Sequence, residues 1–282
     1  MGGVGSKDGA RAGLAATSPR AAASRTTPDA MPRLRWTLIV EAAGRSGADN
    51  MAFDHWLLEH ADREGAGHAW LRLYRWNPPS LSFGRNEPAL ARYDRDLIER
   101  LGIAVVRRPT GGRAVWHEHE LTYAVVAPVA AFGSLRRSYL AIHRRLADAL
   151  RRLGVAASLA PFAGRTPGPG GGACFAHPVG GEVLVDGLKV VGSAQVRLGS
   201  VFLQHGSILL GGSQDIVRQV SRAPAGPIAA TTLQQALGRS VDFDEVATAI
   251  AMAWSGDGVV IRTAEPPARR SRYHDPQWTW RR

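Results

Sequence analysis

The sequence predicts an α+β fold in which mixed or antiparallel β-sheets are flanked by helices. Short segments of alternating apolar and polar residues, such as residues 33–40, predict strands. Asp186-Gly187 is a two-residue hairpin signal. Apolar residues at helical spacing between Ser134 and Leu153 predict a long amphipathic helix. A length of 282 residues suits one large α/β domain or two small ones.

The first half of the chain alternates helices and strands. We expect the first helix to be capped at Asp49-Asn50 and to end near Asp62. Turn and capping residues delimit the next three elements: a strand at residues 70–76, a short helix at 94–101 and a strand at 103–107.

Two hairpins and two helices complete the expected fold. The strands turn at Asp186-Gly187 and again at 198–200, and helices follow near 232–237 and 244–254. We expect residues 1–31 to be a disordered extension, with Met31 as an alternative start, because they carry too few apolar side chains to offset the entropy of ordering. The domain then spans 32–258, and 259–282 form a loose tail that Trp278 and Trp280 are able to pin.

Charge and composition restrict the function classes. The net charge is +11, which fits either an arginine-rich genome or an acidic partner, nucleic acid or protein. The longest mostly apolar stretch, residues 121–132, is too short to span a bilayer. We therefore expect no membrane association. The single cysteine indicates either a reducing, cytoplasmic compartment or simple avoidance of the residue.

Cys174 is the single cysteine of the chain, so it forms no internal disulfide and no structural zinc site. It is an inert apolar residue, an incidental thiol or a nucleophile, and an isolated cysteine is more often inert. Only Lys7 and Lys189 are lysines. Lys189 is either an exposed hairpin lysine or a site residue, because a desolvated lysine, unlike arginine, can lose its proton.

The segment 107–117 joins a strand to a glycine turn and a histidine. Gly111 and Gly112 allow close backbone approach to an anionic or carbonyl oxygen, although the spacing alone favours a purely structural turn. His117 and His205 are candidate proton carriers. The run His-Glu-His-Glu at 117–120 resembles a metal motif, but on a strand its side chains alternate faces, so we expect no metal site.

Three segments together resemble a known superfamily. Arg-Arg-Pro-Thr-Gly-Gly-Arg-Ala-Val-Trp-His (107–117), Gly-Leu-Lys-Val-Val-Gly-Ser-Ala-Gln (187–195) and Leu-Gln-His-Gly-Ser-Ile-Leu (203–209) are similar to the biotin/lipoate protein ligase catalytic domains. The Ala-Cys-Phe setting of Cys174 resembles the octanoyl-[acyl-carrier-protein]:protein N-octanoyltransferases of Gram-positive type. Lipoate–protein ligases usually carry a third glycine where this chain has Arg113, and they need no cysteine.

The resemblance implies a single α+β catalytic domain and an ATP-independent acyl transfer through a Cys174 thioester, assisted by Lys189. The donor would be octanoyl-acyl carrier protein, and the acceptor a lysine of a lipoyl domain, such as the glycine cleavage H protein or a 2-oxoacid dehydrogenase E2 subunit. It implies that no cofactor or metal is needed. The sequence does not indicate an oligomeric state, and we take a monomer as the default. Alternatives are an ATP-dependent lipoate–protein ligase, an octanoyl amidotransferase between lipoyl domains and, outside enzymes, a basic nucleic-acid-binding module. The substrate-binding positions it implies are Arg108, Gly111, Gly112, His117, Val190, Gly192, Ser193, Ala194, His205 and Gly206.

Overall fold

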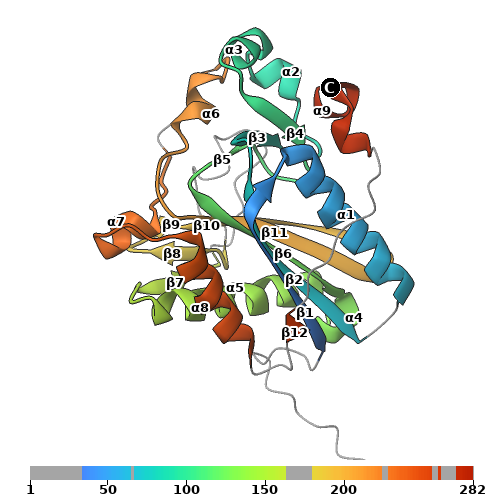
Figure 1. Ribbon diagram of the computed structural model, residues 1–282, viewed down its shortest axis with the longest axis vertical. Helices are drawn as coiled ribbons and strands as arrows, with labels where there is room; N and C mark the ends of the chain where they lie inside the picture. The colour runs from blue at the N-terminus through green and yellow to red at the C-terminus, as the bar shows by residue number, and fades with distance from the viewer. Residues whose placement is uncertain are drawn as a thin grey trace, which may run out of the picture. The chain divides into compact units, whose positions relative to one another are not determined.

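The computed structural model describes residues 34–64, 67–162, 180–223, 228–255, 260–261 and 271–281. A six-stranded sheet of order β10–β11–β6–β2–β1–β12 organises these residues (Figure 1). Its strands are β1 (Arg35–Arg45), β2 (His68–Trp76), β6 (Glu120–Pro128), β10 (Val191–Leu198), β11 (Val201–Leu209) and β12 (Val260–Ile261).

The sheet is mixed. β1 is parallel to both β2 and β12, whereas β2, β6, β11 and β10 pair antiparallel in succession. A parallel pair needs a crossover connection, and α1 (Gly47–Glu64) supplies it between β1 and β2. The mixed or antiparallel sheets expected from the sequence are therefore confirmed.

The start of α1 differs from the sequence prediction. Ser46, rather than Asp49-Asn50, caps the helix, because its Oγ accepts the backbone N–H of Asp49 at 3.1 Å. Asn50 instead lies on the buried face of the helix, and its amide nitrogen donates to the backbone carbonyls of Arg45 and Arg75. The helix thus begins one turn earlier than its polar residues indicated.

Helices cover both faces of the large sheet, with α1 on one side and α5 (Leu135–Arg152) and α8 (Phe243–Trp254) on the other (Figure 1). The alternation along β1 sets this arrangement. Trp36 and Leu38 pack with Ile142 of α5 and Trp254 of α8, whereas the neighbouring Ile39 packs with the apolar side chains of α1. The cap at Ser134 and the long helix that follows it agree with the sequence prediction.

Two three-stranded sheets complete the described β-structure. One has the order β4–β3–β5 and the other β7–β8–β9. Their strands are β3 (Ser80–Phe83), β4 (Ala104–Arg107), β5 (Val115–His117), β7 (Ala157–Leu159), β8 (Val183–Val185) and β9 (Leu188–Lys189). The turn between β8 and β9 has positive φ at Asp186 (50°) and Gly187 (78°), which confirms the predicted hairpin.

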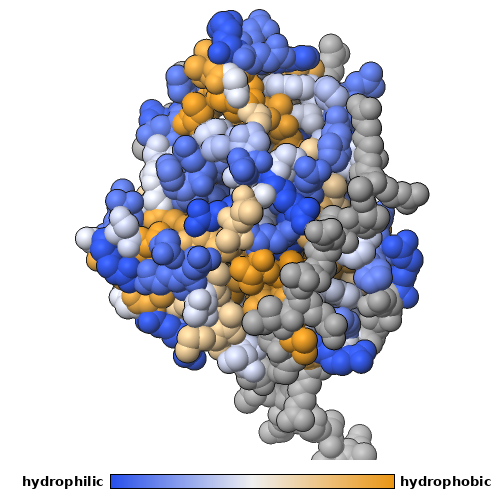
Figure 2. Space-filling view, viewed as in Figure 1, coloured by the Kyte–Doolittle hydropathy of each residue, from blue (hydrophilic) through white to orange (hydrophobic). Residues whose placement is uncertain are grey.

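Short helices surround these sheets: α2 (Ala89–Arg92), α3 (Arg95–Arg100), α4 (Val129–Phe132), α6 (Asp215–Gln219), α7 (Leu233–Leu237), a 3₁₀ turn at Arg272–His274 and α9 (Pro276–Thr279). Figure 2 shows hydrophilic and hydrophobic side chains interspersed on the face in view, with hydrophobic groups at the top near α3 and α6 and also in the middle of the face. Exposed Leu101 follows α3 directly.

The described part of the C-terminal segment packs against the body of the fold. Trp280 is buried and contacts Phe83, with ring centroids 5.2 Å apart. The Arg107 guanidinium, fully buried, donates to the carbonyls of Trp278 and Thr279, each at 3.0 Å. The two tryptophans that the sequence analysis singled out therefore do lie against the domain.

Candidate active site

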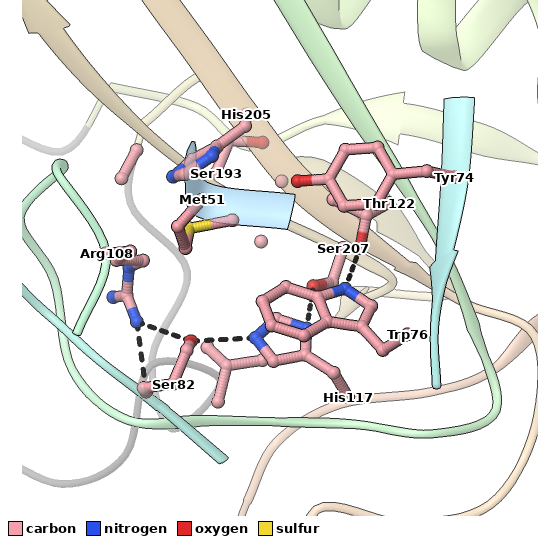
Figure 3. Close-up of a pocket in the computed structure, with 14 residues that line it drawn as sticks. Met51, Tyr74, Trp76, Ser82, Arg108, His117, Thr122, Ser193, His205 and Ser207 are labelled. Atoms are coloured by element: carbon pink, nitrogen blue, oxygen red, sulfur yellow. Dashed lines mark hydrogen bonds between the residues drawn. The ribbon is translucent and has the colours of Figure 1, made fainter. Parts of the chain in front are cut away.

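A pocket of about 360 Å³, including its open mouth, lies between the large sheet and the β4–β3–β5 sheet. Figure 3 shows its side chains converging from α1, β2, β3, β5, β6, β10 and β11. The lining residues are Met51, Tyr74, Trp76, Ser82, Arg108, Val115, His117, Thr122, Gly192, Ser193, Ala194, His205, Gly206 and Ser207. Segments far apart in the chain thus meet at one cavity.

Most of the expected substrate-binding positions meet at this pocket, namely Arg108, His117, Gly192, Ser193, Ala194, His205 and Gly206. The described lining does not include Gly111, Gly112 or Val190. Val190 is fully buried in the core beneath the sheet. Cys174 lies outside the described residues, so its role as a nucleophile remains a prediction.

Lys189 is buried rather than an exposed hairpin lysine. Its side chain is 1% exposed, and Nζ donates to Oε1 of Glu182 at 2.7 Å, a carboxylate that is itself 3% exposed. The hairpin creates this pair, because β8 follows Glu182 directly and Leu184 of β8 pairs with Lys189 of β9. A lysine enclosed in this way is held beside a countercharge and shielded from water.

The residues on either side of the segment 163–179 lie close together. The backbone N–H of Gly181 donates to the carbonyl of Ala160 at 2.8 Å, and that of Ala160 donates to the carbonyl of Glu182 at 2.8 Å. The segment that carries Cys174 thus leaves and rejoins the described fold next to Glu182, the partner of Lys189.

Arg108 is a buried cation in the pocket wall. Its guanidinium donates to the carbonyl of Gly111 at 2.9 Å, to the carbonyl of Arg113 at 2.7 Å and to Oγ of Ser82 at 3.0 Å. The glycine turn therefore directs these carbonyls at an arginine of the same motif. Gly84 packs so closely on this turn that a Cβ there would lie 1.9 Å from the carbonyl oxygen of Gly112.

His205 connects the pocket to a buried acidic residue. Its Nδ1 lies 2.9 Å from Oδ2 of Asp54, and its Nε2 lies 2.6 Å from Oγ1 of Thr110. Burial raises the pKa of Asp54, but the hydrogen bond from His205 and the charge of Arg72 outweigh it, so the pKa is lowered overall. Burial lowers the pKa of His205, and the Asp54 carboxylate offsets part of this shift. The lowered pKa keeps Asp54 ionised, and the lowered pKa of His205 favours its neutral imidazole.

A second buried histidine, His143, contacts the pocket-lining Ser193 from the core side. Nδ1 of His143 faces the carbonyl of Gly181 at 2.7 Å, so this nitrogen donates, and Nε2 accepts from Oγ of Ser193 at 2.8 Å. Tyr123 in turn lies 2.6 Å from the same Oγ and accepts from Gln204. Burial lowers the pKa of His143 to about 4, with the Gly181 carbonyl opposing and the charge of Lys189 adding to the shift.

His117 and Glu120 are brought together by a turn, which corrects the sequence interpretation. Residues 117–120 do not form one strand, because β5 ends at His117 and β6 begins at Glu120. Nδ1 of His117 consequently lies 2.9 Å from Oε1 of Glu120, whereas His119 stays exposed. Within the described ranges, no three His, Cys, Asp or Glu side chains are placed to hold a metal ion.

Sequence reasoning missed several residues of the site. Met51, Tyr74, Trp76 and Ser82 line the pocket, and Glu182 holds Lys189, yet none lies in the three motifs. The segments 49–54 and 73–84, which also resemble the family's opening helix and following strand, contain Met51, Tyr74, Trp76 and Ser82 and were the available signal for them. No described helix is both long enough and apolar enough to cross a membrane.

The arrangement of sheets and helices is that of the lipoate ligase fold. A candidate lipoate protein ligase from T. acidophilum, solved with bound lipoic acid, superposes with a TM-score of 0.69 over 88% of this chain and 100% of its own, at 19% identity. At that level of identity the likeness concerns the fold alone.

Sequence comparison adds the family. Residues 46–255 match the lipoyl protein ligase A/B catalytic domain, and the chain belongs to this family. It is 44% identical over 175 residues to octanoyltransferase LipM of Carboxydothermus hydrogenoformans, covering 61% of this chain and 64% of that relative. It is 37% identical over 243 residues to octanoyltransferase LipM of Moorella thermoacetica, covering 80% and 87%.

Proposed function

We propose that the protein transfers an octanoyl group from octanoyl-acyl carrier protein to a lysine of a lipoyl domain, without ATP. The observation that carries this proposal is the long alignment with octanoyltransferase LipM of M. thermoacetica, which covers most of both chains. The pocket supports it, because residues of all three sequence motifs line one partly apolar cavity.

In this proposal the Cys174 thiolate attacks the donor thioester and forms an octanoyl-enzyme thioester, and the lysine ε-amine of the acceptor then attacks it to give an amide. A thiol has a pKa near 8.5, and a neighbouring ammonium favours the thiolate. Lys189 suits this role, because Glu182 holds its ammonium in place and because Glu182 adjoins the segment that carries Cys174.

Charge is consistent with acidic protein partners. The chain carries a net charge of +11, and α5 exposes Arg136, Arg137 and Arg152. Not all of its arginines are available for steering a partner. Arg145 donates to the carbonyl of Ala253 in α8, and Arg151 pairs with Asp148. We propose that the exposed arginines speed association with the donor or acceptor, an effect that salt would screen.

The test is incubation with octanoyl-acyl carrier protein and no ATP, followed by intact-protein and peptide mass spectrometry. An octanoyl adduct on Cys174, and transfer to an apo lipoyl domain that stops in Cys174→Ala, would support the proposal. Transfer that survives Cys174→Ala would refute the thioester mechanism.

Two further arms separate the enzymatic alternatives. Transfer that requires ATP and free lipoate and survives Cys174→Ser would indicate a lipoate–protein ligase. Transfer that proceeds from an octanoylated lipoyl domain, but not from the carrier protein, would indicate an amidotransferase. DNA binding that weakens with salt, without acyl transfer in any arm, would indicate a basic binding module.

A further inference from the structure

Ser82, His117 and Glu120 form a hydrogen-bonded line in the pocket wall. Ser82 Oγ lies 2.7 Å from Nε2 of His117, and Nδ1 of the same ring lies 2.9 Å from Oε1 of Glu120. The three side chains come from β3, β5 and the first residue of β6, and all three residues are buried. Figure 3 shows Ser82 and His117 together at one side of the pocket.

The neighbouring donors determine where the protons lie. The Glu120 carboxylate can only accept, so Nδ1 of His117 carries a proton and Nε2 is free to accept. Arg108 donates to Ser82 Oγ at 3.0 Å, which leaves the serine hydroxyl to donate to Nε2. Thr122 also donates to Oε1 of Glu120, and Oε2 has no hydrogen-bond partner among the described residues.

Two other histidines contact hydroxyl groups at this site, but with different surroundings. His143, which bonds Ser193, has the neutral carbonyl of Gly181 on its other nitrogen. His205 has a carboxylate behind it, but its hydroxyl partner Thr110 is not among the described pocket-lining residues. Ser207 Oγ also lies 3.3 Å from His117, but at Nδ1, the nitrogen that faces Glu120. Among these contacts, only Ser82–His117 places a pocket-lining hydroxyl on one ring nitrogen and a carboxylate on the other. That is the order of groups which activates a serine nucleophile.

We propose that Ser82 is a second acyl-accepting nucleophile of this pocket, with His117 as its general base and Glu120 orienting the imidazole, and that it acts on medium-chain acyl thioesters and activated esters independently of Cys174. The acyl-chain class rests on the proposed octanoyl transfer, whereas the nucleophile rests on the triad alone.

The proposed reaction consumes only the acyl thioester and water. Ser82 Oγ bonds to the acyl carbonyl carbon while its proton moves to Nε2 of His117, and the carbon–sulfur bond then breaks as that proton passes to the leaving sulfur. Water next attacks the serine ester, and its proton returns through His117 to Oγ, which releases the fatty acid. The carboxylate of Glu120 stabilises the imidazolium formed in each step.

An active-site probe tests the nucleophile without reference to the natural substrate. The Cys174→Ala protein is treated with octyl fluorophosphonate, which bonds to a reactive serine with loss of fluoride, and the labelled peptide is identified by mass spectrometry. We expect labelling at Ser82 and not at Ser193. The rate of labelling at Ser82 should fall about 100-fold in Cys174→Ala/His117→Gln. Absence of label at Ser82 in a folded Cys174→Ala protein would overturn the proposal.

Two more measurements keep the proposal testable if one of these variants fails to fold. Ser82→Cys in the Cys174→Ala background gives a protein with a single thiol, whose alkylation by iodoacetamide at neutral pH should slow when His117→Gln is added. Hydrolysis of p-nitrophenyl octanoate by Cys174→Ala should be lost in Cys174→Ala/Ser82→Ala, and unchanged hydrolysis would also overturn the proposal. Failure of octanoyl transfer from the carrier protein, with Ser82 still labelled, would instead count only against the proposed function.

Discussion

Lys189 donates through Nζ to Oε1 of Glu182 at 2.7 Å, with both side chains almost fully buried. The two residues are seven positions apart in sequence, with β8 and the β8–β9 turn between them. They lie beside the point where the segment 163–179 rejoins the described fold. The two members of a buried ion pair depend on each other, because either charge alone would be costly to keep out of water.

Glu182→Gln should therefore destabilise the protein by about 3 to 5 kcal/mol, because it leaves the Lys189 ammonium buried opposite a neutral amide. Replacing both members, as in Lys189→Met/Glu182→Leu, should recover most of this loss. Urea unfolding of the singles and the double measures the coupling. Glu245→Gln, which removes an exposed partner of Arg239, is the matched control and should leave the midpoint unchanged. Equal effects in the buried and exposed variants would contradict the account.

Stability should fall in mild acid because of His143. Burial lowers its pKa to about 4 from an ordinary value of 6.5. Between these values the unfolded chain binds a proton that the native state does not, so the stabilisation is fully present above pH 6.5 and declines as the pH falls towards 4. The whole window corresponds to about 3 kcal/mol.

Urea unfolding at several pH values between 7 and 4 measures this dependence. In His143→Gln the slope should be shallower by about one proton across the window. His119→Gln, which replaces an exposed side chain, is the matched control and should keep the wild-type slope. A slope that is the same in His143→Gln and His119→Gln would argue against the assignment.

Gly84 and Gly111 should differ sharply in their tolerance of alanine. A Cβ on Gly84 would lie 1.9 Å from the carbonyl oxygen of Gly112, whereas a Cβ on Gly111 would meet nothing within 4 Å. Gly84→Ala should cost about 3 kcal/mol or more, because backbone must move, and Gly111→Ala should stay within about 0.5 kcal/mol. Thermal unfolding of the pair checks this, and a Gly84→Ala protein as stable as Gly111→Ala would show that the turn gives way easily.

Arg107 should hold residues 271–281 against the rest of the fold. Its guanidinium bonds the carbonyls of Trp278 and Thr279 as well as that of Gly84. Burial lowers its pKa to about 10, and the nearby charge of Arg281 adds to this effect. Lysine offers three donors without the planar fork, so Arg107→Lys should cost about 2 kcal/mol or more.

Amide hydrogen exchange measures the local effect of the same substitution on residues 271–281. In Arg107→Lys the amides of residues 271–281 should exchange faster than those of the large sheet, whereas Arg239→Lys, at an exposed position, should leave both unchanged. Exchange that rises evenly over the whole protein would mean that Arg107 supports the fold in general and not this segment.

Local patterns along the chain were enough to predict many elements. The apolar alternation at 33–40, the turn at Asp186-Gly187 and the helix capped by Ser134 are all confirmed, because each depends on neighbouring residues. The motifs also indicated most of the pocket wall, since Gly192, Ser193 and Ala194 share one strand. The cap of α1 was misplaced because Asp49 and Ser46 are both good capping residues, and only the backbone geometry selects one.

The sequence by itself determined the class of fold, the lysine of interest and the family motifs, because these are encoded in residue type and short-range spacing. Only the tertiary structure decided that Lys189 is buried against Glu182 and that Ser82 and Glu120 flank His117. These contacts depend on which strands pair and in which register. A register is set by the packing of a whole sheet face, and no short segment of the chain contains it.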